Sequence, residues 1–529
     1  MKIKKNILFI IIALFTVSNV ASLRSVNAVE KKDEIIIAFG QHEPERGWDP
    51  LHGSGHYGTS LFQSALLRRD TNLEIVKDLA SDYSVSEDRL TWNVKLRDDI
   101  EFTDGEPLTA KDVEFTYAKS KELGTAAVDL TNLKSIEVVN DYEVNFILEE
   151  PDISFVAKMC SLGIVPKHLY NESYGENPVG TGPLKFVEWK KGEQLITEAN
   201  ENYHGDKIPF KKVTFLFIDS DQAATIAKSG VADIVRISNT DVENDFDGYQ
   251  VVSLDTIDNR GLTLPFTPDN GEKTAEGYPI GNNVTSDIAI RKAMNIGIDR
   301  QKIIDAALNG YGSVASSIAD NMPWWNPETK IENDGDIDQA KKILDEAGWK
   351  ESSDGVREKD GVKAELDLYF TYKDRENIAV AVAQQLKEFG IKMTPIFGTW
   401  DDITPKMYSE VVLFGWGGYD PLEIYYNYSS NWRGKDYYNP NYYSNEIIDE
   451  YFSKALHAES EEEANESWKK AQWDGENGLS HLGDAPWVWL VNEKHIYLVR
   501  DGLEIGQQKI QPHGGGWPLV DTLANWTWQ

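Results

Sequence analysis

The sequence predicts a mixed α/β protein of two to four domains or subdomains. Segments with the two-residue period of half-buried strands, 90–96 and 142–148, alternate along the chain with segments of helical period, such as 287–298. The chain has 529 residues, and domains usually hold roughly 100–200 residues each. Its composition of 41% apolar and 11% aromatic residues supports large cores and excludes disorder.

The N-terminus has the pattern of a secretory signal peptide. Lys2, Lys4 and Lys5 precede an apolar run over 7–17, and a small-residue cleavage motif ends at Ala28. The run is too short for a membrane anchor, which needs about 20 residues. We expect 1–28 to be removed. Since Cys160 is the only cysteine, no intramolecular disulfide can form, and no cysteine at the boundary could carry a lipid. The mature protein is therefore expected free in a periplasm or outside the cell.

The elements follow in a clear order. The mature chain opens with a strand-like run at 34–38, and the strands at 90–96 and 142–148 enclose a helix that Thr109 caps. In the second half, apolar periodicity and glycine stop signals predict helices at 287–298, 339–347, 378–389 and 460–473, with a strand at 391–396.

The charge balance excludes two classes of partner. The chain carries 87 Asp and Glu against 53 Lys and Arg, a formal charge of −34. Such a surface repels phosphate backbones and anionic membranes, so we expect no nucleic-acid binding.

Motifs for catalysis are missing. The sequence contains no phosphate-binding loop, no H-E-x-x-H and no G-x-S-x-G. Residues 53–58 (GSGHYG) match the letters G-x-G-x-x-G, but no strand directly precedes them, so they are expected to form a loop. We therefore expect that the protein is not an enzyme.

Histidines are the first candidate constellation. His42, His52 and His56 fall within fifteen residues, and His513 stands near the other end in QPHGGGWP. Imidazole suits borderline transition metals such as Ni²⁺. The alternative is that these are ordinary polar loop residues.

Aromatic residues are the second constellation. Trp416 and Tyr419 lie in the glycine-rich segment 414–421 (FGWGGYDP), and Trp432 follows. Glycines beside rings let the backbone approach a ligand while the rings form walls. Arg433 could bind a ligand carboxylate or form a surface ion pair.

Several segments in order resemble the extracytoplasmic solute-binding proteins of ABC importers, in the peptide and nickel-binding family. They are 79–107, 109–113 (TAKDV), 180–183 (GTGP), 200–203 (NENY), 290–300 (IRKAMNIGIDR) and 340–349 (AKKILDEAGW). The resemblance implies two α/β lobes with mixed sheets, a hinge and a ligand between the lobes. The first lobe would hold 34–265 and 485–529, with an inserted subdomain at about 60–170, and the second lobe 266–484.

The resemblance favours the nickel-binding branch. The acid that peptide-binding members carry shortly after the tryptophan is missing, and Trp416 with Tyr419 looks like the nickel form. His56 falls on the position of a pocket methionine and His52 near a pocket tyrosine. An arginine that nickel-binding relatives use near 159–163 is absent. Arg433 would replace it, or a small neutral chelator such as histidine would carry the metal.

The resemblance thus predicts a carrier for nickel or cobalt held as a chelate. Its closed form would deliver the metal to a membrane permease, and we expect a monomer with no catalytic cofactor. Trp416, Tyr419, Trp432 and Trp517 would surround the chelator, and His56 and His513, with His52 or His42 as alternates, would coordinate the metal. The alternative is a peptide-binding protein, with Asp420 or Glu423 pairing the peptide's amino terminus. A secreted hydrolase is the third class.

Overall fold

The computed structural model describes residues 33–40, 43–44, 46–55, 57–124, 128–435 and 437–529. The expected signal peptide 1–28, His42 and His56 lie outside these residues. None of the helices in the described ranges combines the length and the apolar character that crossing a membrane requires.

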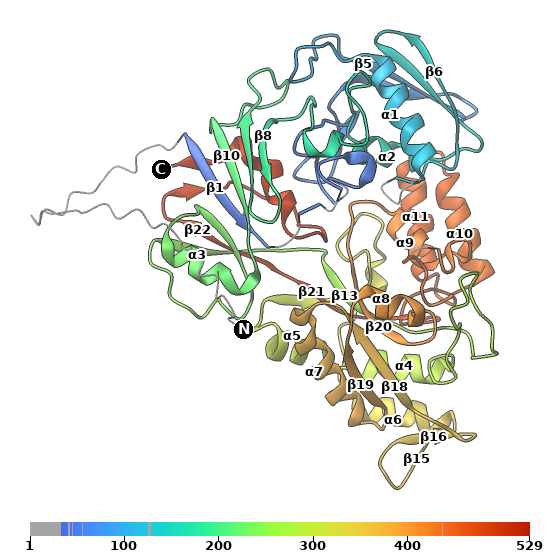
Figure 1. Cartoon of the computed structure of the whole chain (residues 1–529). Helices are drawn as coiled ribbons and strands as arrows, with labels where there is room; N and C mark the ends of the chain where they lie inside the picture. Colours follow the sequence, from blue (N-terminus) through green and yellow to red (C-terminus); the bar gives the residue numbers. More distant parts are fainter. Residues whose placement is uncertain (1–32, 41–42, 45, 56, 125–127, 436) are drawn as a thin grey trace, which may run out of the picture.

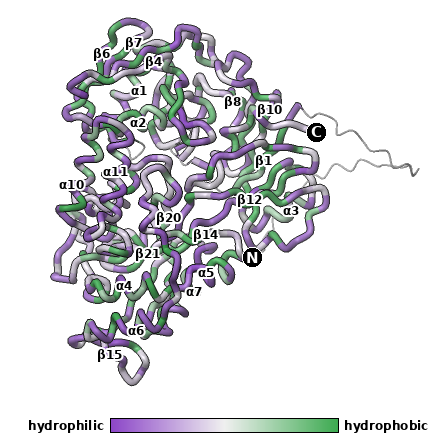
Figure 2. The backbone as a smooth tube through the Cα atoms, turned by 180° about the vertical axis from the view of Figure 1, so that it is seen from behind, coloured by the Kyte–Doolittle hydropathy of each residue, from purple (hydrophilic) through white to green (hydrophobic). Residues whose placement is uncertain are grey.

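A seven-stranded mixed sheet forms the base of the first lobe. Its strands, in spatial order, are β12 (Tyr249–Leu254), β22 (His495–Arg500), β11 (Ile234–Ile237), β1 (Glu34–Phe39), β10 (Lys212–Phe217), β9 (Gln194–Ala199) and β8 (Leu184–Lys190). β1 pairs in parallel with β10 and β11, and β22 joins the sheet from the far end of the chain. Figure 1 shows the C-terminus lying near β1 and β10. Figure 2 shows hydrophobic residues along these strands. The strands contribute to two separate clusters of buried apolar side chains.

A second unit of the first lobe is built on four antiparallel strands. They are β4 (Ala80–Val85), β5 (Thr91–Leu96), β7 (Glu143–Leu148) and β6 (Leu133–Asn140). Helices α1 (Ala110–Leu123) and α2 (Phe155–Ser161) close its apolar cluster. Thr109 caps α1 as the sequence predicts, in a capping box with Asp112.

A six-stranded mixed sheet forms the second lobe. Its strands are β14 (Gly312–Val314), β21 (Trp487–Glu493), β13 (Asn259–Thr263), β20 (Val411–Trp416), β18 (Glu365–Phe370) and β19 (Lys392–Phe397). The helices of this lobe are α4 (Ile288–Gly297), α5 (Arg300–Ala307), α6 (Ile337–Glu346), α7 (Glu376–Lys387), α8 (Trp400–Ile403), α9 (Leu422–Tyr428), α10 (Glu446–Leu456) and α11 (Glu461–Gln472). Strands and helices bury two large apolar clusters, one of which includes residues of α4–α7 and the other residues of α9–α11.

Short elements complete the chain. They include α3 (Ala223–Ser229), β2 (Leu67–Arg69), β3 (Ile75–Lys77), β15 (Lys350–Glu351), β16 (Arg357–Lys359), β17 (Val362–Lys363), β23 (Leu503–Glu504), β24 (Thr527–Trp528) and several 3₁₀ helices, among them Pro50–His52 and Trp517–Asn525. The mixed α/β class predicted from the sequence is confirmed. The segment 53–58 follows a 3₁₀ turn rather than a strand, as expected for a loop.

The chain crosses between the two large sheets twice. It passes from β12 to β13 through 255–258 and returns from β21 to β22 through Lys494. The family resemblance implied lobe boundaries at 265 and 485. Because β13 and β21 pair with each other inside the second sheet, we propose that the boundaries lie at the two crossings instead.

Candidate functional site

A cavity of about 610 Å³ lies between the lobes. The first lobe contributes residues 57–59 and 68–69, parts of α1 and α2, the segment 128–131 and Lys509. The second lobe contributes Glu276 and side chains between Gly418 and Tyr438. A cavity of this size accommodates a small organic molecule or a metal chelate.

The second-lobe wall of the cavity is aromatic. It is formed by the segment that follows β20, by α9 and by the residues after α9. Tyr419 and Trp432, both predicted from the sequence, line the cavity. The Tyr419 hydroxyl donates to the backbone oxygen of Ile510 at 2.5 Å, which joins the second lobe to the C-terminal segment. Trp416 lies behind this wall, with its indole stacked on the cavity residue Tyr438 at 5.3 Å between ring centroids.

Its first-lobe wall is more polar. Arg69 donates to the backbone oxygen of Leu73 at 3.0 Å, and the buried Lys158 forms an ion pair with Asp152 at 3.0 Å. Burial raises the pKa of the Cys160 thiol to about 12, which favours the protonated thiol near neutral pH.

Two acids face the cavity from the start of α9. Burial raises the pKa of Asp420, although the backbone amide of Leu422 donates to it at 2.9 Å. Burial, reinforced by the charge of Asp420, raises the pKa of Glu423 to about 8. Near neutral pH the cavity therefore holds a carboxyl group that readily keeps its proton.

A second cavity of about 390 Å³ adjoins the first and shares Tyr57, Gly58 and Thr59 with it. His52 and Trp517 line this second cavity. His52 Nε2 lies 3.9 Å from the Asp49 carboxylate. The tryptophan therefore lies beside the main cavity and not in the wall that Tyr419 forms.

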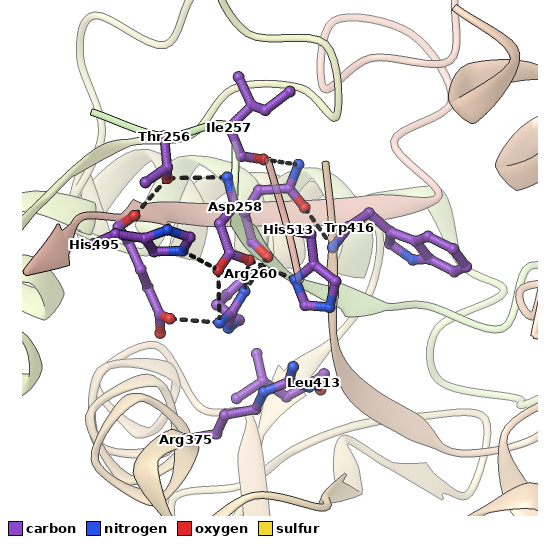
Figure 3. A network of polar contacts seen from close by, with 11 residues as sticks. Thr256, Ile257, Asp258, Arg260, Arg375, Leu413, Trp416, His495 and His513 are labelled. Atoms are coloured by element: carbon purple, nitrogen blue, oxygen red, sulfur yellow. Dashed lines mark hydrogen bonds and ion pairs between the residues drawn. The ribbon is translucent and has the colours of Figure 1, made fainter. Parts of the chain in front are cut away.

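His513 belongs to a buried polar network at the crossing between the lobes. Asp258 is its centre: His513 Nδ1 donates to one carboxylate oxygen at 2.6 Å and His495 Nε2 to the other at 3.0 Å. Figure 3 shows the two imidazoles approaching Asp258 from opposite sides. Arg260 pairs with Asp258 and with Glu493, and we call these five residues the Asp258 network.

The charges of this network are fixed by burial and by Arg260. Burial alone would raise the pKa of Asp258, but Arg260 and the two histidines hold it well below its ordinary value. Burial lowers the pKa of His495 to about 4 and also lowers that of His513. Burial raises the pKa of Glu493 to about 7 despite Arg260. Asp258 is therefore an anion and both imidazoles are neutral at pH 7.

An aspartate anion only accepts hydrogen bonds, so His513 carries its proton on Nδ1 and presents a lone pair on Nε2. The His513 ring lies 5.3 Å from the Tyr57 ring, edge to face. Tyr57 lines both cavities, which places His513 beside the space between the lobes.

The remaining predicted residue, Arg433, is exposed and donates to the Ser430 backbone oxygen at 3.1 Å. It does not appear in the cavity wall, whereas Arg68 and Arg69 do. Sequence reasoning missed these arginines and Tyr57. An arginine pair in a strongly acidic chain, and a tyrosine beside His56, were the available signals. Within the described ranges, no three His, Cys, Asp or Glu side chains form a metal-binding group.

The lobes also touch at a second place, outside the cavity wall. The Ile153 amide donates to the Leu456 backbone oxygen at 2.9 Å, and Arg89 donates to the backbone oxygen of His457. Hydrogen bonds therefore join the lobes here as well as at Tyr419 and Ile510.

A two-lobed α/β fold with a cavity between the lobes defines a class of binding protein. The sequence model of the bacterial extracellular solute-binding proteins, family 5 (middle), matches residues 74–436. The chain belongs to this family, whose members are the substrate-binding proteins of ABC importers and work with membrane permeases.

Individual relatives bind different substrates. Protein XP55 of Streptomyces lividans is 32% identical over 497 residues, which cover 89% of this chain and 86% of that protein. The oligopeptide-binding protein AppA of Bacillus subtilis is 30% identical, covering 66% of each chain. NikZ from Campylobacter jejuni, solved in complex with Ni(L-His), superposes with a TM-score of 0.78 at 25% identity, covering 94% of this chain and 99% of that one. AppA with a nonapeptide gives 0.72 at 23% identity, covering 94% and 100%, and shares the fold. The two-lobed fold predicted by resemblance is thus confirmed.

Proposed function

We propose that this protein captures nickel, or cobalt, as a complex with a small organic chelator and delivers it to an ABC permease. The mature protein would act as a monomer outside the cytoplasmic membrane, after cleavage at Ala28. The lobes would open, take up the complex into the 610 Å³ cavity and close again by a hinge motion at the two crossings.

The observation that carries the proposal is the hydrogen bond from His513 Nδ1 to Asp258. Histidines that bind metals commonly donate their other ring N–H to a carboxylate, which fixes the tautomer and makes the free nitrogen more basic. This pair has that arrangement beside Tyr57 at the cavity edge. Because His513 is neutral at pH 7, its Nε2 can bind a metal without first losing a proton.

Few protein ligands are available to complete the metal's coordination. His52 lines the adjoining cavity, and His42 and His56 remain the other predicted donors. A metal with one or two protein imidazoles needs further donors, and a chelator would supply them. The likeness to NikZ, solved with Ni(L-His), supports an amino acid in this role.

The chelator would lie against Tyr419, Trp432 and Tyr438. Arg69, rather than Arg433, is placed to receive a carboxylate of the chelator. Trp416 would act by supporting the ring of Tyr438 and Trp517 by shaping the adjoining cavity.

A peptide ligand is the second candidate, and one observation favours it. Asp420 and Glu423 both face the cavity, where either could pair with a peptide's amino terminus. The relationship to the oligopeptide-binding AppA supports the same reading. In that case the aromatic wall would accept peptide side chains.

Metal analysis tests the proposal. The mature protein is incubated with Ni²⁺ and free histidine and then desalted, beside the variants His513→Ala and His56→Ala/His513→Ala. We expect the wild type to retain one equivalent of nickel and the double variant to retain none. His168→Ala is the matched control, because that histidine is exposed and bonded to Asp104. Folded wild type without nickel would contradict the proposal, and mass spectrometry would then identify any co-purified peptide.

A further inference from the structure

Glu423 is a buried acid in the cavity wall without a partner for one of its oxygens. It is 9% exposed, and its Oε2 has no hydrogen-bond partner among the residues that the structure describes. A buried polar atom without a partner costs free energy, so its persistence calls for an explanation. Since Glu423 lines the cavity, a group on the ligand can supply the missing hydrogen bond.

The backbone around Glu423 makes room for its carboxyl group. A side chain at Gly418 would begin 2.7 Å from Glu423 Oε1, so glycine at this position lets the carboxyl lie against the chain. The Glu423 amide donates to the Asp420 backbone oxygen, which fixes the start of the helix. The carboxyl group therefore lies against the backbone at Gly418, beside the start of the helix.

The charged and titratable groups around Glu423 are themselves acidic. Asp420 precedes Glu423 on the same segment. The charge of Glu423 contributes to raising the pKa of Tyr57, which lies in the first lobe. No described lysine, arginine or histidine forms an ion pair with Glu423 within 4.0 Å, whereas Arg69 and Lys158 both act on Asp420. Burial without a cation raises the pKa of Glu423 to about 8, so a ligand that brings positive charge would favour its carboxylate.

We propose that Glu423 recognises an amine of the ligand by accepting a hydrogen bond from its N–H group. This inference rests on the proposed function for the identity of the ligand: in a histidine chelate the group is the α-amine. A metal-bound amine keeps its N–H bonds, and the metal makes them stronger donors. The ligand class is thus a chelator with a primary amine, and Glu423 selects it against chelators without one.

The test compares the binding of two nickel complexes to each of two proteins. Wild type and Glu423→Gln are titrated calorimetrically with the nickel complexes of histidine and of imidazolepropionate, which lacks the amine. A hydrogen bond to a charged acceptor predicts that the variant binds the histidine complex about 10–100-fold more weakly. Its affinity for the imidazolepropionate complex should stay within about twofold of wild type.

Two controls separate binding from stability. Glu410→Gln changes another acid whose pKa burial raises, to about 7, but which is not part of the cavity wall, so it should leave affinity unchanged. Glu423→Gln, and Glu423→Leu as a second variant, should melt at or above the wild-type temperature, because each removes a buried unpaired acid. A stabilised protein with weakened binding is not expected from a structural role alone.

The outcomes distinguish this inference from the proposed function. Equal loss of affinity for both complexes, or no loss for either, would overturn the role of Glu423 and leave nickel capture intact. If wild type binds neither complex, the proposed function fails. The same two proteins are then titrated with a tripeptide and its N-acetylated form. A loss confined to the free amine would still support Glu423 as an amine acceptor, and an equal response to both peptides would refute it.

Discussion

Replacing Asp258 with asparagine tests how the protein orients His513, the metal ligand that we propose. The two carboxylate oxygens of Asp258 accept from His513 at 2.6 Å and from His495 at 3.0 Å. An asparagine amide keeps one acceptor oxygen and replaces the other with an NH₂ donor. Since His495 Nδ1 has no hydrogen-bond partner in the part of the chain that the structure describes, that ring can change tautomer and receive the new donor, and the bond to His513 can survive without its charge.

The expected loss follows from this geometry. Removing the carboxylate that orients a metal-binding histidine typically lowers metal affinity by about 10–100-fold. At 1.4 kcal/mol for each tenfold change, this is about 1.4–2.8 kcal/mol. Stability falls as well, because Arg260 loses one of its two carboxylates. Breaking a buried ion pair costs about 3–5 kcal/mol, and the remaining bond to Glu493 should hold the loss at the lower end.

Calorimetric titration with the nickel–histidine complex measures the binding change, and a thermal melt confirms that the variant is folded. His495→Gln is the control, since it disturbs the same carboxylate from the side away from His513. We expect it to lower stability and to leave affinity within about twofold. If Asp258→Asn binds nickel as tightly as wild type while His513→Ala loses it, Asp258 does not orient the ligand. If both network variants lose affinity equally, the effect comes from the fold of the network instead.

Three further predictions concern pH, the lobe contact and the chelator. Burial lowers the pKa of His495 to about 4 from 6.5, so the unfolded chain binds a proton that the folded chain does not. Stability should therefore fall from pH 6.5 toward pH 4, by about 2 kcal/mol at pH 5 for this residue, and denaturation of His495→Gln should lack that part of the slope. Tyr419→Phe removes the bond to Ile510, worth about 1 kcal/mol, and should weaken calorimetric binding roughly fivefold; unchanged affinity would mean that this contact does not stabilise the closed form. Arg69→Ala should weaken binding of nickel–histidine about tenfold or more but not of nickel–histamine, which lacks the carboxylate, and Arg433→Ala should affect neither.

Local signals in the sequence predicted the elements well. The helix expected to begin after Thr109 does so, and the one expected at 287–298 becomes α4 with Asp287 as its N-cap. The stop expected at Gly348 is also present, since this glycine has a left-handed φ of 88° just after α6. Caps and stops involve neighbours within a few residues, so the sequence displays them directly.

Only part of the site could be predicted in this way: Tyr419 and Trp432 do line the cavity. Sequence reasoning chose Arg433 because it adjoins Trp432, but the turn after Trp432 leaves that arginine exposed. Arg69 reaches the cavity from a short hairpin in the other lobe. The segments that meet at the cavity are set by strand pairings between residues far apart in the sequence. No local sequence pattern predicts those pairings.

The position of the Asp258 network follows from those long-range pairings. Asp258 lies on the outgoing crossing between the sheets, and Glu493 and His495 flank Lys494 on the return. The backbone amide of His513 donates to Gly417 O at 2.8 Å, which ties the same histidine to the second lobe. The carboxylate that binds the His513 imidazole, our proposed metal ligand, therefore lies where the lobes are joined. We infer that a change in the angle between the lobes would move His513 relative to Tyr57, so metal binding and closure depend on the same few contacts.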